Sequence, residues 1–185
     1  MTPVEGRNYL ACGYCQTFHF PMELEDSADR ITPLYERGDV ACPVCCEQLV
    51  AGAFDKVRIV YCHRCRGVLI PNEVFAQVVC DRRHQYTGAD ASPVPIDRHQ
   101  YERRLDCPLC QGQMEVHPYH GPGNAVIDSC AACHLLWLDQ GKLAVIEGAP
   151  GQRKPVASSY QPSLRPIAAQ ASEDTTIDLL DLFFG

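Results

Sequence analysis

Ten of the twelve cysteines in this chain of 185 residues occur as C-x-x-C pairs. The five pairs are Cys12/Cys15, Cys42/Cys45, Cys62/Cys65, Cys107/Cys110 and Cys130/Cys133, and Cys46 and Cys80 lie outside them. Disulfide scaffolds are typical of shorter secreted chains, whereas the first residues, MTPVEGRNYL, lack a basic region followed by an apolar core. We therefore expect no secretory signal, a cytoplasmic location, and reduced thiols that bind metal.

The cysteine pairs mark an internal repeat. CPVCCEQLV at 42–50 matches CPLCQGQMEV at 107–116, and CHRCRGVLIPNEV at 62–74 is similar to CAACHLLWLDQGK at 130–142. Sixteen residues separate the two pairs in the first copy and nineteen separate them in the second. Both lengths suit a β-hairpin that links two C-x-x-C turns, so we expect two copies of one supersecondary unit.

Each copy continues with an apolar run and then a helix signal. Asn72 is expected to cap a helix that begins near Glu73, after the apolar run Val68–Ile70. Asp139 is expected to cap a helix over Gln140–Glu147, with Gly148 at its end.

A half-buried strand is expected just before the second cysteine pair of the first copy. There Val57, Ile59 and Tyr61 alternate with Arg58 and Val60. In the second copy, HPYHGPGN at 117–124 has the composition of a turn.

Two facing C-x-x-C turns supply four sulfur ligands in a tetrahedron, the arrangement of a closed structural Zn²⁺ site. We expect one zinc ion in each copy, and the eight ligands are Cys42, Cys45, Cys62, Cys65, Cys107, Cys110, Cys130 and Cys133. Gly67 is expected to adopt a backbone angle that other residues resist. Because each copy is too small for a sufficient apolar core, the metal should contribute roughly 10 kcal/mol or more to its folding.

The order C-P-x-C, hairpin, C-x-x-C, apolar strand and short helix resembles the transcription factor IIB-type zinc ribbon domain. The second copy carries the clearest match, CHLLWLDQGKL, and the resemblance covers about 42–75 and 105–146. It implies a zinc ribbon fold and the eight ligands already named, and it implies little about activity. Leu69 stands where the family has Trp, Pro71 where it has Asp, and Leu135 where it has Gly.

The N-terminal pair, Cys12 and Cys15, has no matching C-x-x-C pair, and three interpretations stay open. Cys80 and His84 are four residues apart on the predicted helix of the first copy and could complete a third metal site, with His19 as a further candidate. Alternatively, the N-terminal pair could join the first pair of the first copy in a ring of rubredoxin-like spacing. It could also act as a dithiol redox switch. Without a third site, Cys80 is a small buried residue and His84 a solvated helix end.

The fold class expected is a set of small zinc-stabilised β modules with short helices, arranged as a tandem repeat. The boundaries are an N-terminal C-x-x-C segment at 1–41, ribbons at 42–84 and 105–148, linkers at 85–104 and 149–172, and a tail at 173–185. The second linker is rich in Pro, Ser and Ala without apolar periodicity, which predicts disorder. In the tail, Ile177, Leu180 and Phe184 share one helical face, which predicts a short acidic amphipathic helix. It would pack either on its own chain or on a protein partner.

The net charge of −7 is unevenly distributed. Residues 56–104 carry nine basic and five acidic side chains, whereas residues 1–55 carry three basic and nine acidic ones, and residues 105–185 carry four and nine. The central arginines are Arg58, Arg64, Arg66, Arg82, Arg83, Arg98, Arg103 and Arg104. We expect them to compensate the anionic tetrathiolate sites, and nucleic-acid binding is the alternative.

No catalytic residue is expected, because the chain has no G-x-S-x-G, P-loop or H-E-x-x-H motif and an all-thiolate site has no open coordination position. No segment is apolar for long enough to span a bilayer. The function expected is that of a non-enzymatic zinc ribbon protein, an adaptor or transcription-associated factor that acts through protein contacts. The alternatives are a nucleic-acid binder that uses the central arginines and a zinc-thiol redox sensor or holdase.

Overall fold

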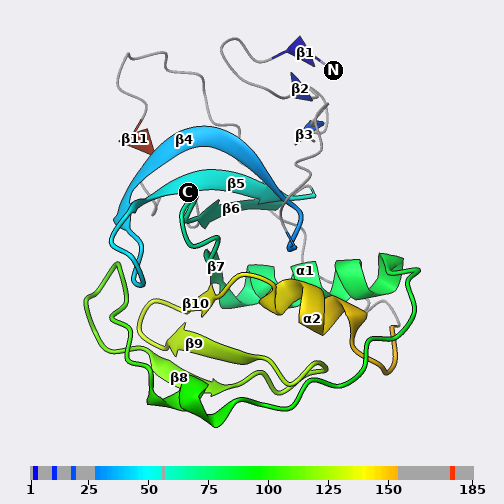
Figure 1. The fold of residues 1–185 in the computed structure, drawn as a ribbon. Helices are drawn as coiled ribbons and strands as arrows, with labels where there is room; N and C mark the ends of the chain where they lie inside the picture. The colour runs from blue at the N-terminus through cyan, green and yellow to red at the C-terminus, as the bar shows by residue number, and fades with distance from the viewer. Residues whose placement is uncertain are drawn as a thin grey trace.

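The computed structural model describes residues 28–55 and 57–153 together with four strands of two residues each (Figure 1). Three of these strands, β1 (Thr2–Pro3), β2 (Leu10–Ala11) and β3 (Phe18–His19), form a small antiparallel sheet in that order. The fourth belongs to the main sheet.

The main sheet of the described residues has eight strands in the order β11-β4-β5-β6-β7-β10-β9-β8. They are β4 (Ile31–Ala41), β5 (Gln48–Phe54), β6 (Val57–Tyr61), β7 (Val68–Pro71), β8 (Glu115–Pro118), β9 (Val126–Cys130), β10 (Leu135–Leu138) and β11 (Thr176–Ile177). Neighbouring strands are antiparallel, except that β11 is parallel to β4. The hairpins β5–β6 and β8–β9 are those predicted between the cysteine pairs of each copy. We call residues 42–84 the first repeat and residues 105–148 the second repeat.

The two repeats join into one sheet along β7 and β10, which lie next to each other in Figure 1. When Cys65 is aligned with Cys133, Leu69 and Trp137 occupy the same position in the two repeats, and these two residues lie opposite each other in the β7–β10 pair. The pairing therefore relates the repeats by an approximate two-fold axis that passes between Leu69 and Trp137. Two separate small modules were expected, whereas the structure gives both repeats one continuous sheet.

Apolar side chains are buried on both faces of this sheet, in two clusters. The helix-side cluster contains Ile31, Phe54, Ile59, Tyr61, Val68, Ile70, Phe75, Val78, Val79, Ala125, Ile127, Leu136, Leu138, Leu143 and Ile146. The cysteine-side cluster contains Val40, Cys42, Leu49, Val60, Cys62, Leu69, Leu105, Cys107, Met114, Cys130, Leu135 and Trp137. Successive residues of β7 and β10 alternate between the two clusters, which explains why both strands are continuous apolar runs.

The prediction of a half-buried strand at 57–61 is wrong for the second half of β6. Ile59, Val60 and Tyr61 are all buried. Ile59 and Tyr61 belong to the helix-side cluster and Val60 to the cysteine-side cluster. The alternation in the sequence predicted one solvated face, but here the cysteine-side cluster covers that face.

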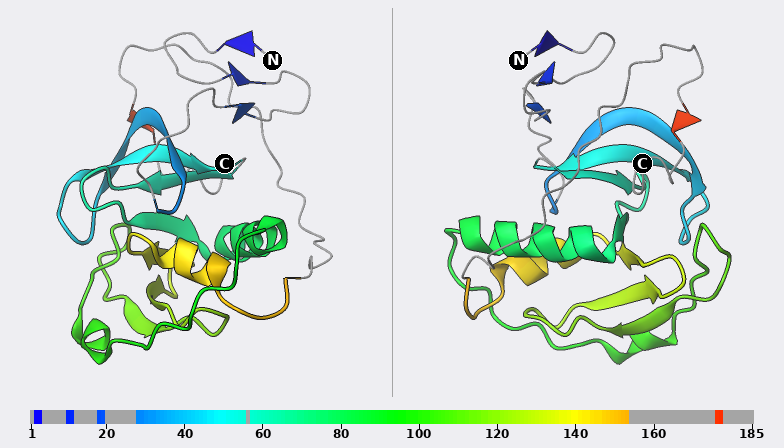
Figure 2. Two further views of the ribbon diagram at one scale, coloured as in Figure 1. Left: turned by 45° about the vertical axis from the view of Figure 1, so that its right-hand side comes forward. Right: turned by 180° about the vertical axis from the view of Figure 1, so that it is seen from behind.

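The helices α1 (Asn72–Gln85) and α2 (Lys142–Gly148) contact each other and supply side chains to the helix-side cluster (Figure 2). The predicted cap of α1 is wrong: the helix begins at Asn72 itself, after Pro71, and no side chain caps it. The backbone N–H of Asn72 instead donates to the carbonyl of His134 at 2.9 Å, so the second repeat caps the helix of the first.

The predicted cap of α2 is also wrong, although the helix does end at Gly148. It begins at Lys142, after Gly141 at a φ of 81°, and Asp139 does not cap it. The carboxylate of Asp29 accepts hydrogen bonds from the backbone N–H groups of Gly141, at 2.6 Å, and Ala144, at 3.0 Å. A residue that precedes both repeats therefore caps the helix of the second.

The segments outside the repeats match the predicted organisation only in part. Residues 86–97 contain no helix or strand, and a 3₁₀ helix, η1 (Arg98–Glu102), leads toward the second repeat. Thr176 and Ile177 form β11, paired with Arg37 and Gly38 of β4, so the predicted tail helix is wrong at these two residues. Residues 154–175 and 178–185, which include most of the second linker and most of the tail, lie outside the described residues. Neither α-helix in the described part of the chain has the length and apolar character that a membrane crossing requires.

Candidate metal centres

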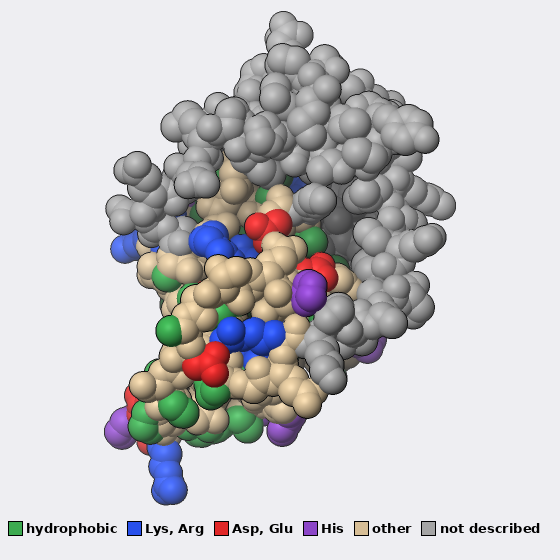
Figure 3. Space-filling view, turned by 90° about the vertical axis from the view of Figure 1, so that its right-hand side faces the viewer, with side chains coloured by type: hydrophobic (Ala, Val, Ile, Leu, Met, Phe, Trp, Pro, Cys, Tyr) green, Lys and Arg blue, Asp and Glu red, His purple; other side chains and the backbone are tan. Residues whose placement is uncertain are grey.

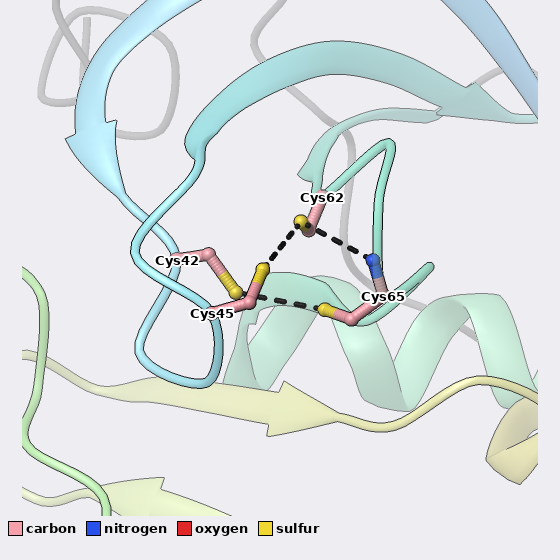
Figure 4. Close-up of side chains that lie close together, drawn as sticks. All are labelled: Cys42, Cys45, Cys62 and Cys65. Atoms are coloured by element: carbon pink, nitrogen blue, oxygen red, sulfur yellow. Dashed lines mark hydrogen bonds between the residues drawn. The ribbon is translucent and has the colours of Figure 1, made fainter.

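The first repeat brings four cysteine sulfurs together at one end of its hairpin (Figure 4). The Sγ atoms of Cys42, Cys45, Cys62 and Cys65, the first tetrad, all lie within 4.8 Å of one another. Cys42 Sγ is 3.6 Å from Cys65 Sγ, and Cys45 Sγ is 3.4 Å from Cys62 Sγ. These separations exceed the disulfide bond length of about 2.05 Å. They approach the separation of about 3.8 Å that a metal–sulfur distance near 2.3 Å gives in a tetrahedron. The first tetrad therefore fits a single metal ion.

The second repeat forms the equivalent group, the second tetrad, from Cys107, Cys110, Cys130 and Cys133. Its Sγ atoms also lie within 4.8 Å of one another, and Cys110 Sγ is 3.6 Å from Cys130 Sγ. The two tetrads differ in exposure, because Cys110 is exposed whereas the corresponding Cys45 is only partly exposed. The structure thus groups the cysteine pairs as the repeat predicts and leaves no role for a rubredoxin-like ring that includes Cys42 and Cys45.

Each of the four C-x-x-C pairs in the described part of the chain lies in a six-residue loop with the same backbone geometry, which we call a knuckle. The four knuckles are Cys42–Glu47, Cys62–Gly67, Cys107–Gly112 and Cys130–Leu135. In the first three, the first and last residues are joined by a backbone N–H···O bond of 2.7–2.8 Å, and in the fourth they form a strand pair. The residue after the second cysteine is left-handed in every knuckle, with φ of 60° at Cys46, 61° at Arg66, 58° at Gln111 and 54° at His134.

Backbone N–H groups of the knuckles point at the sulfurs. Val44 N lies 3.4 Å from Cys42 Sγ, and Cys65 N lies 3.5 Å from Cys62 Sγ. The N–H of Glu47 lowers the pKa of Cys45, and the N–H of Gly112 lowers the pKa of Cys110 to about 7. These donors stabilise thiolates, which are the form that binds metal.

Burial acts in the opposite direction on the inner cysteines. It raises the pKa of Cys42, Cys107 and Cys133, and it raises the pKa of Cys65 to about 11. A buried thiolate is costly unless a cation compensates its charge. Each tetrad therefore combines sulfurs that ionise readily with sulfurs that need a bound cation to do so.

The role predicted for Gly67 is wrong, since Arg66 adopts the left-handed conformation and Gly67 has no positive φ. Gly67 is required by packing instead. A Cβ atom at this position would lie 2.2 Å from Cζ2 of Trp137, which is 0% exposed. The knuckle Cys62–Gly67 of the first repeat is thus covered by the indole ring of Trp137 in the second repeat.

A polar cluster beside Trp137 was not predicted from the sequence. Arg103 donates two hydrogen bonds to Asp139, at 2.8 and 2.9 Å, and a third to Asp128, which is 0% exposed. The indole N–H of Trp137 donates to Asp139 at 3.3 Å. Burial raises the pKa of Asp128, and the contact with Arg103 opposes this effect. The Trp-Leu-Asp segment was a visible signal, but its partner Arg103 lies 36 residues away.

The third metal site stays a prediction. Cys12 and Cys15 lie outside the described residues, as does the side chain of His19. Cys80 and His84 are on α1, and neither belongs to a tetrad or to another metal-ligating group of the described residues. The Nδ1 atom of His84, an exposed residue, lies 3.3 Å from the carbonyl of Arg153.

Six of the eight central arginines are engaged by carboxylates or backbone carbonyls. Arg58 pairs with Glu36, Arg64 with Glu47, Arg82 with Asp55 and Glu147, and Arg103 with Asp128 and Asp139, while Arg83 and Arg104 donate to backbone carbonyls. On the face drawn in Figure 3, Lys and Arg side chains lie next to Asp and Glu side chains. Acidic side chains therefore pair with four of the eight arginines, and the expected compensation of the tetrathiolate sites by these arginines stays a prediction.

Comparisons with known proteins leave the zinc ribbon resemblance as a prediction. No family model, no curated protein and no solved structure matches this chain significantly.

Proposed function

We propose that the chain binds two structural Zn²⁺ ions, one in each tetrad, and acts as a non-enzymatic zinc ribbon protein. The observation that supports this most directly is the pair of tetrads, each with four Sγ atoms within 4.8 Å of one another. Four thiolates in a tetrahedron suit Zn²⁺ better than hard cations such as Mg²⁺ or Ca²⁺. When bound, each ion would cross-link two knuckles and compensate the buried thiolates.

A structural rather than catalytic role follows from the ligand set. Four sulfur ligands complete the coordination sphere of Zn²⁺, so no position stays open for water or substrate. The side chains around the first tetrad that belong to the cysteine-side cluster, such as Leu49 and Val60, are apolar and buried. Neither provides a proton donor or a nucleophile.

Metal analysis tests the proposal. Native mass spectrometry and elemental analysis of protein purified without added metal should give two zinc ions per chain. Cys42→Ser and Cys107→Ser should each lower this to one, whereas Cys46→Ser, which removes an exposed thiol beside the first tetrad, should leave it at two. Iron in place of zinc, or full loading of both tetrad variants, would contradict the proposal. A third ion lost in Cys12→Ser and Cys80→Ser would establish the third site.

We further propose that the protein acts as an adaptor or transcription-associated factor, with the first knuckle as a contact surface. Val44 at its tip is 44% exposed and, with Val94, is one of the two large hydrophobic residues that are exposed in the described part of the chain. Affinity purification of the full chain should lose its specific partner in Val44→Asp and keep it in Val94→Asp. Identical partner sets in both variants would argue against this surface.

The two alternative functions differ in the support that they have. The engaged arginines give no support to nucleic-acid binding. A redox-sensor function has one observation in its favour, the exposure of Cys110 in the second tetrad. It predicts that mild peroxide releases the metal ion of the second tetrad before that of the first. Retention of both ions would remove this alternative.

A further inference from the structure

The second repeat holds a knuckle of the first repeat in place. Gly67 closes the knuckle Cys62–Gly67 through its carbonyl, which accepts from Cys62 N at 2.8 Å. The indole of Trp137 lies so close to Gly67 that a Cβ atom there would be 2.2 Å from Cζ2. The backbone that positions Cys62 and Cys65 therefore packs directly against β10.

The reverse contact also exists. His134 immediately follows Cys133 in the fourth knuckle, and its carbonyl accepts the first N–H of α1, from Asn72, at 2.9 Å. Knuckle Cys130–Leu135 of the second tetrad is therefore fixed by the helix of the first repeat.

The strands that leave these two knuckles pair with each other. β7 begins at Val68 and β10 at Leu135, and their register joins Leu69 to Trp137 across the approximate axis. Both residues belong to the cysteine-side cluster, which also contains two cysteines of each tetrad. A conformational change in either knuckle must therefore disturb packing that the other knuckle shares.

We propose that the two tetrads load metal cooperatively, with Trp137 and Gly67 as the positioning residues that couple them. This inference rests on the proposed function, metal binding by both tetrads. An ion in one tetrad orders its knuckles and the strand that follows, and that strand is the template for its partner in the other repeat. The second ion then binds to a tetrad whose knuckles are already ordered, so its binding costs less conformational entropy. Because coupling is reciprocal, each ion raises the affinity of the other tetrad for metal.

Native mass spectrometry of partly loaded protein tests this without a binding model. The metal-free chain is titrated with Zn²⁺ in the presence of a competing chelator, so that ions exchange, until the mean loading is one ion per chain. Two independent sites, whatever their affinities, leave at least half of the chains with a single ion. A tenfold coupling between equal sites lowers this fraction to about a quarter. We expect the fraction with one ion to fall below one half, with chains that carry no ion or two ions in excess.

Two substitutions test the route of the coupling. Gly67→Ala displaces the indole, and Trp137→Leu removes it without adding atoms to the knuckle. Both should raise the one-ion fraction to one half or more. Gly112→Ala is the matched control. Gly112 occupies the corresponding place in a knuckle of the second tetrad, and alanine keeps the backbone N–H that faces Cys110. A Cβ atom there meets only Cys110 Sγ, at 3.4 Å, so the one-ion fraction should stay below one half.

The outcomes separate the two proposals. A wild-type chain that binds two ions at excess metal but keeps half or more of its chains singly loaded would overturn cooperative loading and leave the proposed function intact. Failure to bind two ions at excess metal would overturn the proposed function itself. An unchanged distribution in both Trp137→Leu and Gly67→Ala would overturn the role of the Trp137–Gly67 contact.

Discussion

Substitution of Gly67 by alanine should destabilise the protein through a single contact with Trp137. The added methyl group would lie 2.2 Å from Cζ2 and 2.8 Å from both Cε2 and Cη2 of the indole. Carbon atoms pack at about 3.5 Å or more, so the ring must retreat by roughly 1.3 Å. Trp137 is 0% exposed and hydrogen-bonded to Asp139, which leaves the ring little freedom to move. Overpacking of this kind costs about 1–3 kcal/mol, and we expect the upper end of that range.

Gly112→Ala separates this packing effect from any requirement of the knuckle backbone. Gly67 and Gly112 both close a knuckle, and neither has a positive φ. At Gly112 the methyl group makes an ordinary van der Waals contact. The substitution should therefore leave the stability of the protein unchanged or raise it by less than about 1 kcal/mol, because alanine lowers the conformational entropy of the unfolded chain. Urea unfolding of both metal-loaded variants, with metal content confirmed, gives the comparison. Equal stabilities of Gly67→Ala and Gly112→Ala would refute the packing argument.

Three further perturbations have defined expected outcomes. Chelation should abolish the cooperative thermal transition and the near-UV circular dichroism, because two structural ions at roughly 10 kcal/mol each exceed the usual net stability of about 5–15 kcal/mol; a persistent transition in the reduced, metal-free chain would contradict this. Arg103→Ala should lower the free energy of unfolding by about 3–5 kcal/mol, measured by thermal unfolding, because it leaves the buried carboxylate of Asp128 without its cation. Substitution of the exposed Arg98 by alanine should change this free energy little. Asp29→Ala should cost about 1 kcal/mol and speed hydrogen exchange at the N-terminus of α2, and unchanged exchange there would show that the carboxylate does not cap the helix.

The local parts of the candidate site could be predicted from the sequence. The spacing of the cysteine pairs was sufficient to group Cys42 with Cys65 and Cys107 with Cys133, because a hairpin brings its two ends together whatever the rest of the chain does. The same reasoning predicted the hairpins β5–β6 and β8–β9 and the end of α2 at Gly148. Each of these depends on residues close to one another in the chain.

The parts that depend on distant residues could not be predicted in this way. The cap of α2 comes from Asp29, which lies 112 residues before Gly141. Asn72 and Asp139 have side chains suited to capping. However, it is the backbone N–H of Asn72 that donates, to the carbonyl of His134, and the carboxylate of Asp139 accepts from the guanidinium of Arg103. Val60 was expected on a solvated face because nothing in its own strand shows that the cysteine-side cluster covers it.

The joining of the two repeats explains why they carry different residues at two pairs of equivalent positions, Leu69 and Trp137, and Gly67 and Leu135. Leu69 and Trp137 are equivalent positions that lie opposite each other on the approximate axis, with Cβ atoms about 4.5–5.5 Å apart in such a pair. Both are 0% exposed, so two indoles could not be accommodated there. Leu69 therefore complements Trp137. Gly67 makes room for the indole, whereas its counterpart Leu135 is opposed by no second indole and can carry a side chain that fills the cysteine-side cluster. Leu69 and Leu135, two of the three positions that depart from the expected zinc ribbon pattern, therefore lie in the core that the two repeats share.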